Sequence, residues 1–304
     1  MRIGVGFPQQ ESEMGTDPGA IREYAEAAES LGYSHLRMGD HVLGANAASR
    51  PGWPGPYDHT HLWHEPLTLF GYLAGITEKI ELVSSVLILP QRQTALVAKQ
   101  AAEVDFLSGG RLRLGIGVGW NDVEYEALGE DFHSRGLRIE EQIDVMRALW
   151  TQELVTFEGR WHKITDAGLN PMPVHRPIPV WIGGGPGSTG STSTAGTERV
   201  LRRVARKADG WFPSLGLQDG VEAVIARLHE YVRSEGRDPL DVGIEGSVSL
   251  DDQGPDIWVQ RALEWKGAGA THLSVYTLGF GFTSLSQHIA SMRLFQEAWS
   301  DVGR

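Results

Sequence analysis

The segment Val97–Asn121, with the sequence VAKQAAEVDFLSGGRLRLGIGVGWN, contains a complete helical pattern followed by a complete strand pattern. Apolar residues recur first at the spacing of an amphipathic helix, at Val97, Ala101, Val104 and Leu107. Ser108-Gly109-Gly110 ends that pattern, because glycine readily adopts the left-handed conformation that terminates helices. The run Leu112–Val118, apolar except for Arg113, then predicts a strand covered on both faces, as in a parallel sheet.

The same alternation of helix and strand runs through all 304 residues. Eight candidate strands follow from apolar, β-branched runs: Arg2–Phe7, His35–Met38, Ile80–Leu87, Leu112–Val118, Pro179–Ile182, Gly210–Pro213, Val242–Ser249 and His272–Tyr276. Eight such units favour a closed (β/α)8 barrel, or TIM barrel, formed by residues 1–304 as a single α/β domain. A doubly wound open sheet stays the alternative, because periodicity alone does not show that a sheet closes.

Three connections are too long to be simple loops, and such connections usually carry function. Gly39–Glu65 follows the second strand and is rich in Gly, Pro, His and Trp. Thr151–Arg176 lies in the connection after the fourth strand and contains a predicted hairpin across Glu158-Gly159. Gly183–Gly196 follows the fifth strand and consists almost entirely of Gly, Ser and Thr. All three are expected at the carboxyl ends of the strands, which form the catalytic face of a barrel enzyme.

The composition excludes several classes of protein. Cysteine is absent, which excludes disulfides, cysteine-bound zinc, iron–sulfur clusters and a thiol nucleophile. The net charge of −12 argues against a nucleic-acid partner, because such binding relies on Lys and Arg to neutralise phosphates. No apolar stretch approaches the ~18–20 residues of a membrane span, and the N-terminal run lacks the features of a signal peptide. We therefore expect a cytoplasmic enzyme that acts on a small molecule.

The ends of the second and third strands carry polar residues that could take part in chemistry. Asp40 and His41 follow the second strand, where a histidine can exchange a proton near neutral pH. The alternative for this pair is a turn cap and a bond to a backbone carbonyl. The third strand ends in Ser84, Ser85 and Val86, and the two hydroxyls could contact a ligand or bond locally to the backbone.

The fourth and fifth strands end in glycine. Gly117 and Gly119 precede Trp120 and Asn121, and the missing side chains would let a flat ligand, or a neighbouring strand, approach the backbone. Gly183-Gly184-Gly185 leads to Thr197, the expected N-cap of a helix, so that free amides and the helix dipole would form a phosphate cradle. Most of that helix's basic residues are expected on a solvated face: Arg199, Arg202, Arg203, Arg206 and Lys207.

Several histidines in the loop after the second strand could suggest a metal site. A His-x-His pair can bind zinc at the end of a strand, but this one lies inside a Pro/Gly/Trp-rich loop. We therefore expect no metal, and a metal-dependent hydrolase remains only an alternative. The loop is expected to line an aromatic substrate pocket instead. The histidines are His59, His61 and His64, and the aromatic residues are Trp53, Tyr57 and Trp63.

These motifs, in this order and at these spacings, resemble those of the luciferase-like monooxygenase superfamily, and most closely its coenzyme F420-dependent oxidoreductase branch. The resemblance covers most of residues 1–214. It rests on Gly39-Asp40-His41-Val42, Ser84–Pro90, Leu107–Leu112, Gly117–Trp120, Trp181–Gly184 and Ala208–Trp211.

The resemblance implies a barrel with the cofactor ring in its mouth and a non-prolyl cis peptide at the end of the third strand, here Ser85–Val86. It also implies that Asp40 and His41 lie near the reactive edge of the ring. Two features depart from the family. Pro186–Gly196 is an apparent insertion where relatives have a few residues, and Trp120-Asn121 stands where sugar-phosphate dehydrogenases of the F420 group carry a Glu.

The resulting hypothesis is an F420-dependent oxidoreductase that transfers a hydride between the deazaflavin and a small organic substrate. His41 is the expected proton partner, and Asp40 the residue that orients it or the ring. The expected cofactor-binding residues are Asp40, Ser84, Ser85, Val86, Gly117, Trp120, Asn121, Gly183, Gly184, Gly185 and Thr197. An FMN-dependent monooxygenase on the same barrel and a non-catalytic cofactor-binding relative are the alternatives. By analogy with the family, a homodimer is possible.

Overall fold

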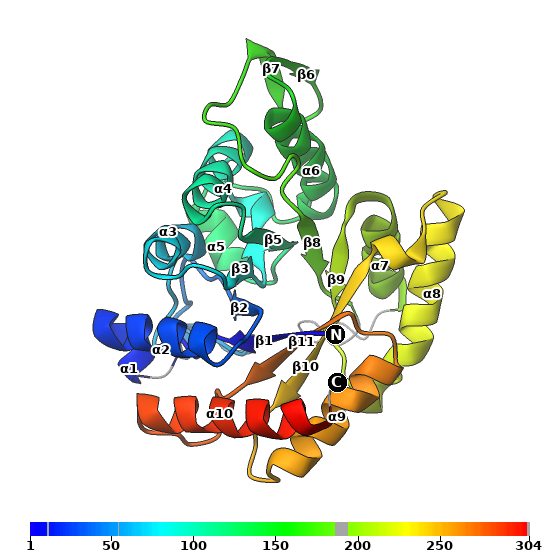
Figure 1. Ribbon diagram of the computed structural model, residues 1–304. Coiled ribbons are helices and arrows are strands. Elements are labelled where there is room, and N and C mark those ends of the chain that lie inside the picture. The colour runs from blue at the N-terminus through cyan, green and yellow to red at the C-terminus, as the bar shows by residue number, and fades with distance from the viewer. Residues whose placement is uncertain (11, 54, 186–193, 303–304) are drawn as a thin grey trace.

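Eight parallel strands close into a barrel with helices arranged around it (Figure 1). The computed structural model describes residues 1–10, 12–53, 55–185 and 194–302. Neighbouring strands follow the order β3-β2-β1-β11-β10-β9-β8-β5, and β5 also pairs with β3. The strands are β1 (Arg2–Gly6), β2 (His35–Met38), β3 (Glu81–Ser84), β5 (Leu112–Gly117), β8 (Val180–Gly183), β9 (Gly210–Phe212), β10 (Gly243–Ser249) and β11 (His272–Tyr276). The predicted barrel is confirmed. The open-sheet alternative is wrong, because β3 pairs with β5 and the sheet closes on itself.

The helices pack on the outside of the barrel, as their apolar stripes predict. The helix predicted to end at Ser108-Gly109-Gly110 does so, and Gly109 has a φ of 70° in the left-handed region. The helices are α1 (Ser12–Thr16), α2 (Pro18–Ser30), α3 (Pro66–Ile76), α4 (Thr94–Ser108), α5 (Asp122–Ala127), α6 (Arg135–Thr151), α7 (Thr194–Lys207), α8 (Val221–Ser234), α9 (Pro255–Gly267) and α10 (Leu285–Val302).

The third strand differs from its prediction. The run Ile80–Leu87 was expected to be continuous, but β3 ends at Ser84 and pairing resumes only in β4 (Leu87–Ile88). Between them lies a cis peptide bond, Ser85–Val86, where the family resemblance implied one. The apolar pattern does not reveal this interruption, because Val86 is as apolar as the strand residues around it.

The predicted hairpin in the fourth connection is present. It consists of β6 (Val155–Glu158) and β7 (Lys163–Ala167) and lies at the top of Figure 1, beyond α4 and α6. Its turn is tied to α6 because the carboxylate of Glu141 accepts hydrogen bonds from the amides of Arg160, Trp161 and His162. The hairpin stands apart from the mouth of the barrel and adds no side chain to the cavity described below.

The inside of the barrel is partly charged. The guanidinium of Arg113 on β5 donates to Glu245 on β10 at 2.7 Å, and His35 on β2 lies 3.1 Å from the same carboxylate. These strands are not neighbours in the sheet, so their side chains meet across the barrel interior. Although burial acts to raise it, the pKa of Glu245 is held well below its usual value by His35 and Arg113. Burial lowers the pKa of His35, and Glu245 opposes the fall.

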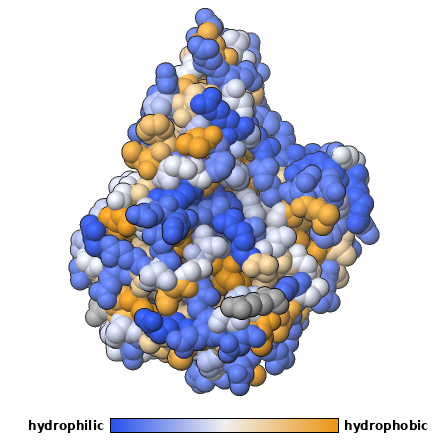
Figure 2. All heavy atoms as spheres, viewed as in Figure 1, coloured by the Kyte–Doolittle hydropathy of each residue, from blue (hydrophilic) through white to orange (hydrophobic). Residues whose placement is uncertain are grey.

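The surface is mainly hydrophilic, as expected for a chain with this net charge (Figure 2). A group of hydrophobic residues gathers over α4 in this view, where Leu96, Phe106 and Leu107 are exposed. None of the helices in the described ranges is long and apolar enough to span a membrane.

Candidate active site

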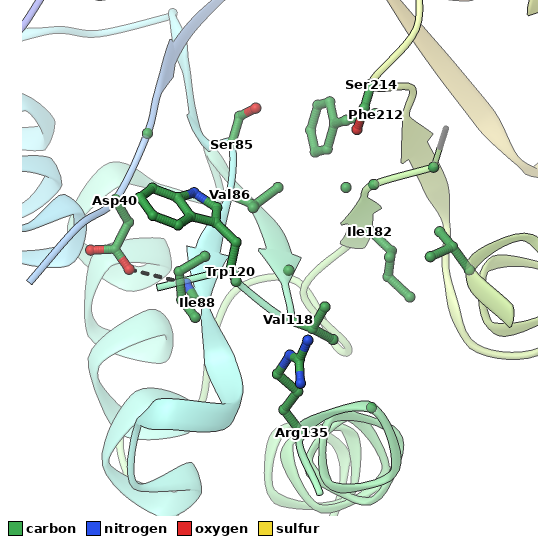
Figure 3. Close-up of a pocket in the computed structure, with 18 of the residues that line it drawn as sticks. Asp40, Ser85, Val86, Ile88, Val118, Trp120, Arg135, Ile182, Phe212 and Ser214 are labelled. Carbon is green, nitrogen blue, oxygen red and sulfur yellow. Dashed lines mark hydrogen bonds between the residues drawn. The ribbon is translucent and has the colours of Figure 1, made fainter. Parts of the chain in front are cut away.

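A cavity of about 630 Å³ opens at the carboxyl ends of the strands, the face on which barrel enzymes carry their active sites. Its volume lies within the range of small-molecule and cofactor sites. Its walls come from the segments that follow β2, β3, β5, β8 and β9, together with the first turns of α6 and α7. Figure 3 shows Val86 at the centre of this lining, with Trp120 on one side and Ile182 on the other.

Two of the predicted cofactor-binding glycines make room for Val86. A Cβ on Gly117 would lie 2.5 Å from one methyl of Val86, and a Cβ on Gly183 would lie 2.5 Å from the other. Both distances are far below van der Waals contact. The glycines at the ends of β5 and β8 therefore let the Val86 side chain stand between the two strands, which shapes the floor of the cavity.

His41 lies in the cavity wall and is held by a carboxylate that the sequence did not indicate as functional. Its Nδ1 is 3.1 Å from Oε1 of Glu124 on α5, and the Glu124 side chain is buried. Within the described part of the chain Nε2 has no hydrogen-bond partner, so it is the nitrogen left for a ligand. A carboxylate on Nδ1 fixes the tautomer and orientation of an imidazole and stabilises its protonated form.

Glu124 also fixes the loop that carries His41. The same Oε1 accepts hydrogen bonds from the amides of Val42 at 2.6 Å and Leu43 at 3.2 Å. The spacing Asn121-x-x-Glu124 matches a capping box, in which the glutamate would bond back to its own helix. Asn121 does cap α5, with Oδ1 accepting from the Val123 amide, but Glu124 turns to the β2 loop instead.

Asp40 lines the cavity, and both oxygens of its carboxylate are bonded to groups of the protein itself. Its Oδ1 accepts from Arg92 at 2.8 Å and its Oδ2 from the Ile88 amide at 3.0 Å, the contact drawn as a dashed line in Figure 3. Burial raises the pKa of Asp40, and Arg92 opposes the rise. These bonds tie the end of β2 to β4, so Asp40 positions the segment around Val86.

Aromatic rings surround His41. Its ring centroid lies 4.7 Å from that of Trp63, 5.4 Å from Trp120 and 5.5 Å from Tyr57. Trp63, Tyr57 and Trp120 line the cavity, whereas the ring of Trp53 lies 5.6 Å from that of Trp120, tilted by 60°, and does not line the cavity. This part of the cavity is suited to an apolar or aromatic ligand next to a proton-exchanging group.

The far end of the cavity, between α6 and α7, is positively charged. Arg135 at the start of α6 forms no ion pair with a carboxylate in the described ranges, whereas its neighbour Arg138 is paired with Glu130. Gly184 and Gly185 form the opposite side, with φ values of 131° and 139° that other residues rarely adopt. The end is completed by His133, Gly136, Gly196, Thr197, Arg199 and Arg203.

One expectation about α7 is wrong and another is confirmed. Thr197 is not the N-cap, because α7 begins at Thr194 and places Thr197 in its first turn, where it still lines the cavity. Most of the basic residues of α7 are exposed, as expected, and only Arg203 is buried. Arg206 pairs with Glu140, and Lys207 pairs with Asp144, which holds α7 against α6. Residues 186–193, most of the apparent insertion, lie outside the described residues.

Two further predicted contacts do not reach the cavity. Ser84 is buried, donates to the carbonyl oxygen of Gly115 at 2.8 Å and accepts from the Gly115 amide at 3.0 Å, so it joins β3 to β5. Asn121 is buried as well, and its Nδ2 donates to the carbonyl oxygen of Leu43. Both hold strands or loops that carry the site, and neither faces a ligand.

Two histidines of the loop after β2, His61 and His64, each contact a different residue. The Nδ1 of His61 lies 3.0 Å from Asp58, and the Nε2 of His64 lies 3.2 Å from the carbonyl oxygen of Met14. Across the residues that the structure describes, no three His, Cys, Asp or Glu side chains form a group that could hold a metal ion.

A closed parallel barrel with a cavity at its carboxyl face, lined by a histidine, aromatic rings and arginines, has the architecture of a barrel enzyme. The sequence profile of the luciferase-like monooxygenase family matches residues 1–281, and the chain belongs to that family. It is therefore an oxidoreductase.

Three similar proteins show the range of the family. An uncharacterised protein of Mycobacterium tuberculosis is 30% identical over 282 residues, which cover 90% of this chain and 92% of that protein. An FMNH2-dependent dimethylsulfone monooxygenase of Pseudomonas putida is 28% identical over 193 residues, or 62% of this chain and 50% of that protein. The solved structure of an F420-dependent secondary alcohol dehydrogenase bound to an F420–acetone adduct has a TM-score of 0.75 at 16% identity, covers 98% of this chain and 97% of that one, and shares the fold.

Proposed function

We propose that the protein is an F420-dependent oxidoreductase that transfers a hydride between the deazaflavin and a small organic substrate, and that it acts in the cytoplasm. The observation that carries the proposal is the His41–Glu124 pair, which places an oriented imidazole among aromatic rings in the cavity. When bound, the cofactor supplies the hydride chemistry, and the protein supplies binding, orientation and a proton.

The described residues fit a flavin or deazaflavin. Val86 lies beside Trp120, in the space that Gly117 and Gly183 leave for its methyl groups, and a flat ring would pack against it. Gly184, Gly185 and the first turn of α7 line this end of the cavity, and they would lie beside a phosphate because a helix N-terminus favours an anion. The ring would thus lie near His41, and the tail near Arg135.

Each catalytic role follows from a contact. His41 would give a proton to, or take one from, the substrate oxygen or nitrogen through Nε2, since Nδ1 is bonded to Glu124. Glu124 would stabilise the protonated imidazole, and Asp40 would keep the Val86 segment in place. Trp63, Tyr57 and Trp120 would exclude water from the reacting groups, which strengthens these electrostatic interactions.

The charge at the far end of the cavity favours F420 over FMN. FMN ends in a single phosphate, whereas the tail of F420 extends beyond its phosphate with further carboxylates. Gly184 and Gly185 are called the glycine cradle from here on. Arg135 lies across the cavity from them and forms no ion pair in the described ranges. A cation beyond the phosphate site is of use to a tail with several negative charges, and Arg binds carboxylates well.

Calorimetric titration of the purified protein with F420 and with FMN tests the cofactor directly. We expect F420 to bind at least tenfold more tightly than FMN. Tight binding of FMN without binding of F420 would overturn the proposal that the cofactor is F420. The protein would then be better explained as an FMN-dependent monooxygenase. Binding of F420 with no turnover of alcohols, ketones or activated alkenes would favour a non-catalytic relative.

A further inference from the structure

Arg37, the third residue of β2, places a positive charge on the floor of the cavity. Its side chain is only 13% exposed, yet it belongs to the cavity lining. The guanidinium carbon lies 4.6 Å from the ring centroid of Phe212 and 5.6 Å from that of Tyr276. Its Nε donates to Oγ of Ser85, the residue next to Val86. Stacking between two rings and this hydrogen bond hold the planar group in one orientation.

The carboxylate nearest to Arg37 is largely used by other groups. Glu245 accepts from Arg113 at 2.7 Å and from Ser274 at 2.6 Å, and His35 lies at 3.1 Å. Arg37 lies at 3.5 Å from Glu245, the longest of these contacts. Glu245 therefore neutralises the charge of Arg37 only in part, and the Arg37 side chain also lines the cavity. Burial also raises the pKa of the adjacent Tyr276 to about 12, so no anionic phenolate balances it.

Arg37 and Arg135 lie at different ends of the site. In Figure 3, Ser85 and Phe212, both in contact with Arg37, lie at the opposite end of the view from Arg135, with Val86 and Val118 between them. A ligand whose anionic tail binds near Arg135 has its ring system toward Arg37. Arg135 and the glycine cradle already provide a binding site for the tail, so tail binding does not explain why Arg37 lies in the cavity.

We propose that Arg37 balances the negative charge which hydride addition places on the ring of the bound cofactor, and thereby sets its reduction potential. This inference rests on the proposed function, since it requires a flavin or deazaflavin in the cavity. A hydride brings two electrons and one proton to a neutral ring and leaves one negative charge, spread over N1 and the C2 oxygen. A desolvated cation close to that charge favours the reduced form over the oxidised form.

The test is the reduction potential of F420, or of FMN if FMN binds, in complex with the wild type and with Arg37→Gln. We expect the variant to lose at least tenfold in its preference for the reduced cofactor, which lowers the two-electron potential by about 30 mV. Arg37→Lys keeps the charge and should keep most of the preference. Arg135→Gln is the matched control, because it removes a cation from the tail end and should weaken both redox states equally.

A second measurement needs no variant, in case Arg37→Gln does not fold. The reduced cofactor on the wild type should stay anionic at least one pH unit below the pH at which the free reduced cofactor takes up a proton. The complex could form while the reduction potential in Arg37→Gln, or the ionisation of the reduced cofactor on the wild type, is unchanged. The inference about Arg37 is then wrong, and the proposed function still stands. If the wild type binds neither F420 nor FMN, the proposed function fails with it.

Discussion

Replacing Glu124 by Gln removes one charge from the site while leaving its shape nearly intact. The new amide keeps an oxygen where Oε1 accepts from the Val42 and Leu43 amides and faces Nδ1 of His41. Truncation to Ala would be less informative, because the Val42 and Leu43 amides would both lose their hydrogen-bond partner. Glu124→Gln therefore separates the charge of Glu124 from its role in holding the loop.

The expected magnitude follows from the type of hydrogen bond. A bond to a charged acceptor contributes about 1.5–3 kcal/mol and a neutral one about 0.5–1.5, so the imidazolium of His41 loses about 1–2 kcal/mol. Turnover should therefore fall roughly 5–30-fold. Cofactor affinity should stay within about twofold, since Glu124 does not line the cavity.

The assay is single-turnover hydride transfer, followed by the absorbance of the cofactor across a range of pH. Glu126→Gln is the matched control, because Glu126 is exposed on the same short helix and its loss changes the net charge equally. His41→Ala should reduce turnover by about 10²–10⁴, and adding Glu124→Gln to it should cost nothing further. If Glu124→Gln behaves like Glu126→Gln, or if its effect persists in the absence of His41, the pair does not act as we reason.

Three further predictions concern the tail site, the floor of the cavity and acid stability. Arg135→Gln should weaken F420 binding about 10–100-fold but leave the binding of FMN, which has no charge beyond its phosphate, unaffected in the same titration. Gly117→Ala should lower the melting temperature and cofactor affinity because its Cβ would meet Val86, and adding Val86→Ala should restore both. Burial lowers the pKa of His272 from 6.5 to about 3, so below pH 6.5 the unfolded chain takes up a proton that the folded chain refuses. Between pH 7 and pH 5, the free energy of unfolding measured in urea should therefore fall by about 2 kcal/mol more for the wild type than for His272→Gln.

The sequence predicts the barrel well because each βα unit is encoded locally. The helix ending at Gly109 and the strand Leu112–Gly117 can both be found from a window of about 20 residues. Closure is different, since it depends on the pairing of β3 with β5, which no single window contains. The break at Ser85–Val86 also escapes pattern analysis, and only the family resemblance indicated it.

The site is predictable where one strand end carries the chemistry, and not where partners come from distant segments. His41 follows from its place after β2. Glu124 lies 83 residues further on, and its capping-box spacing suggests a purely local role. Arg37 has its nearest carboxylate in Glu245, 208 residues away, and only the register of the barrel shows that both point inward.

The distribution of charge explains how an acidic protein can hold an anionic ligand. With a net charge of −12, the long-range field does not attract an anion, so the site depends on cations that lack a close acidic partner. On α7 the carboxylates of α6 occupy Arg206 and Lys207, and their role is to pack the two helices together. Arg135 lies one turn before the first of those carboxylates, Glu140, and forms no ion pair in the described ranges. If the cavity holds the anionic tail proposed above, we expect its selectivity to arise from where the acidic residues of α6 begin, rather than from an excess of basic residues.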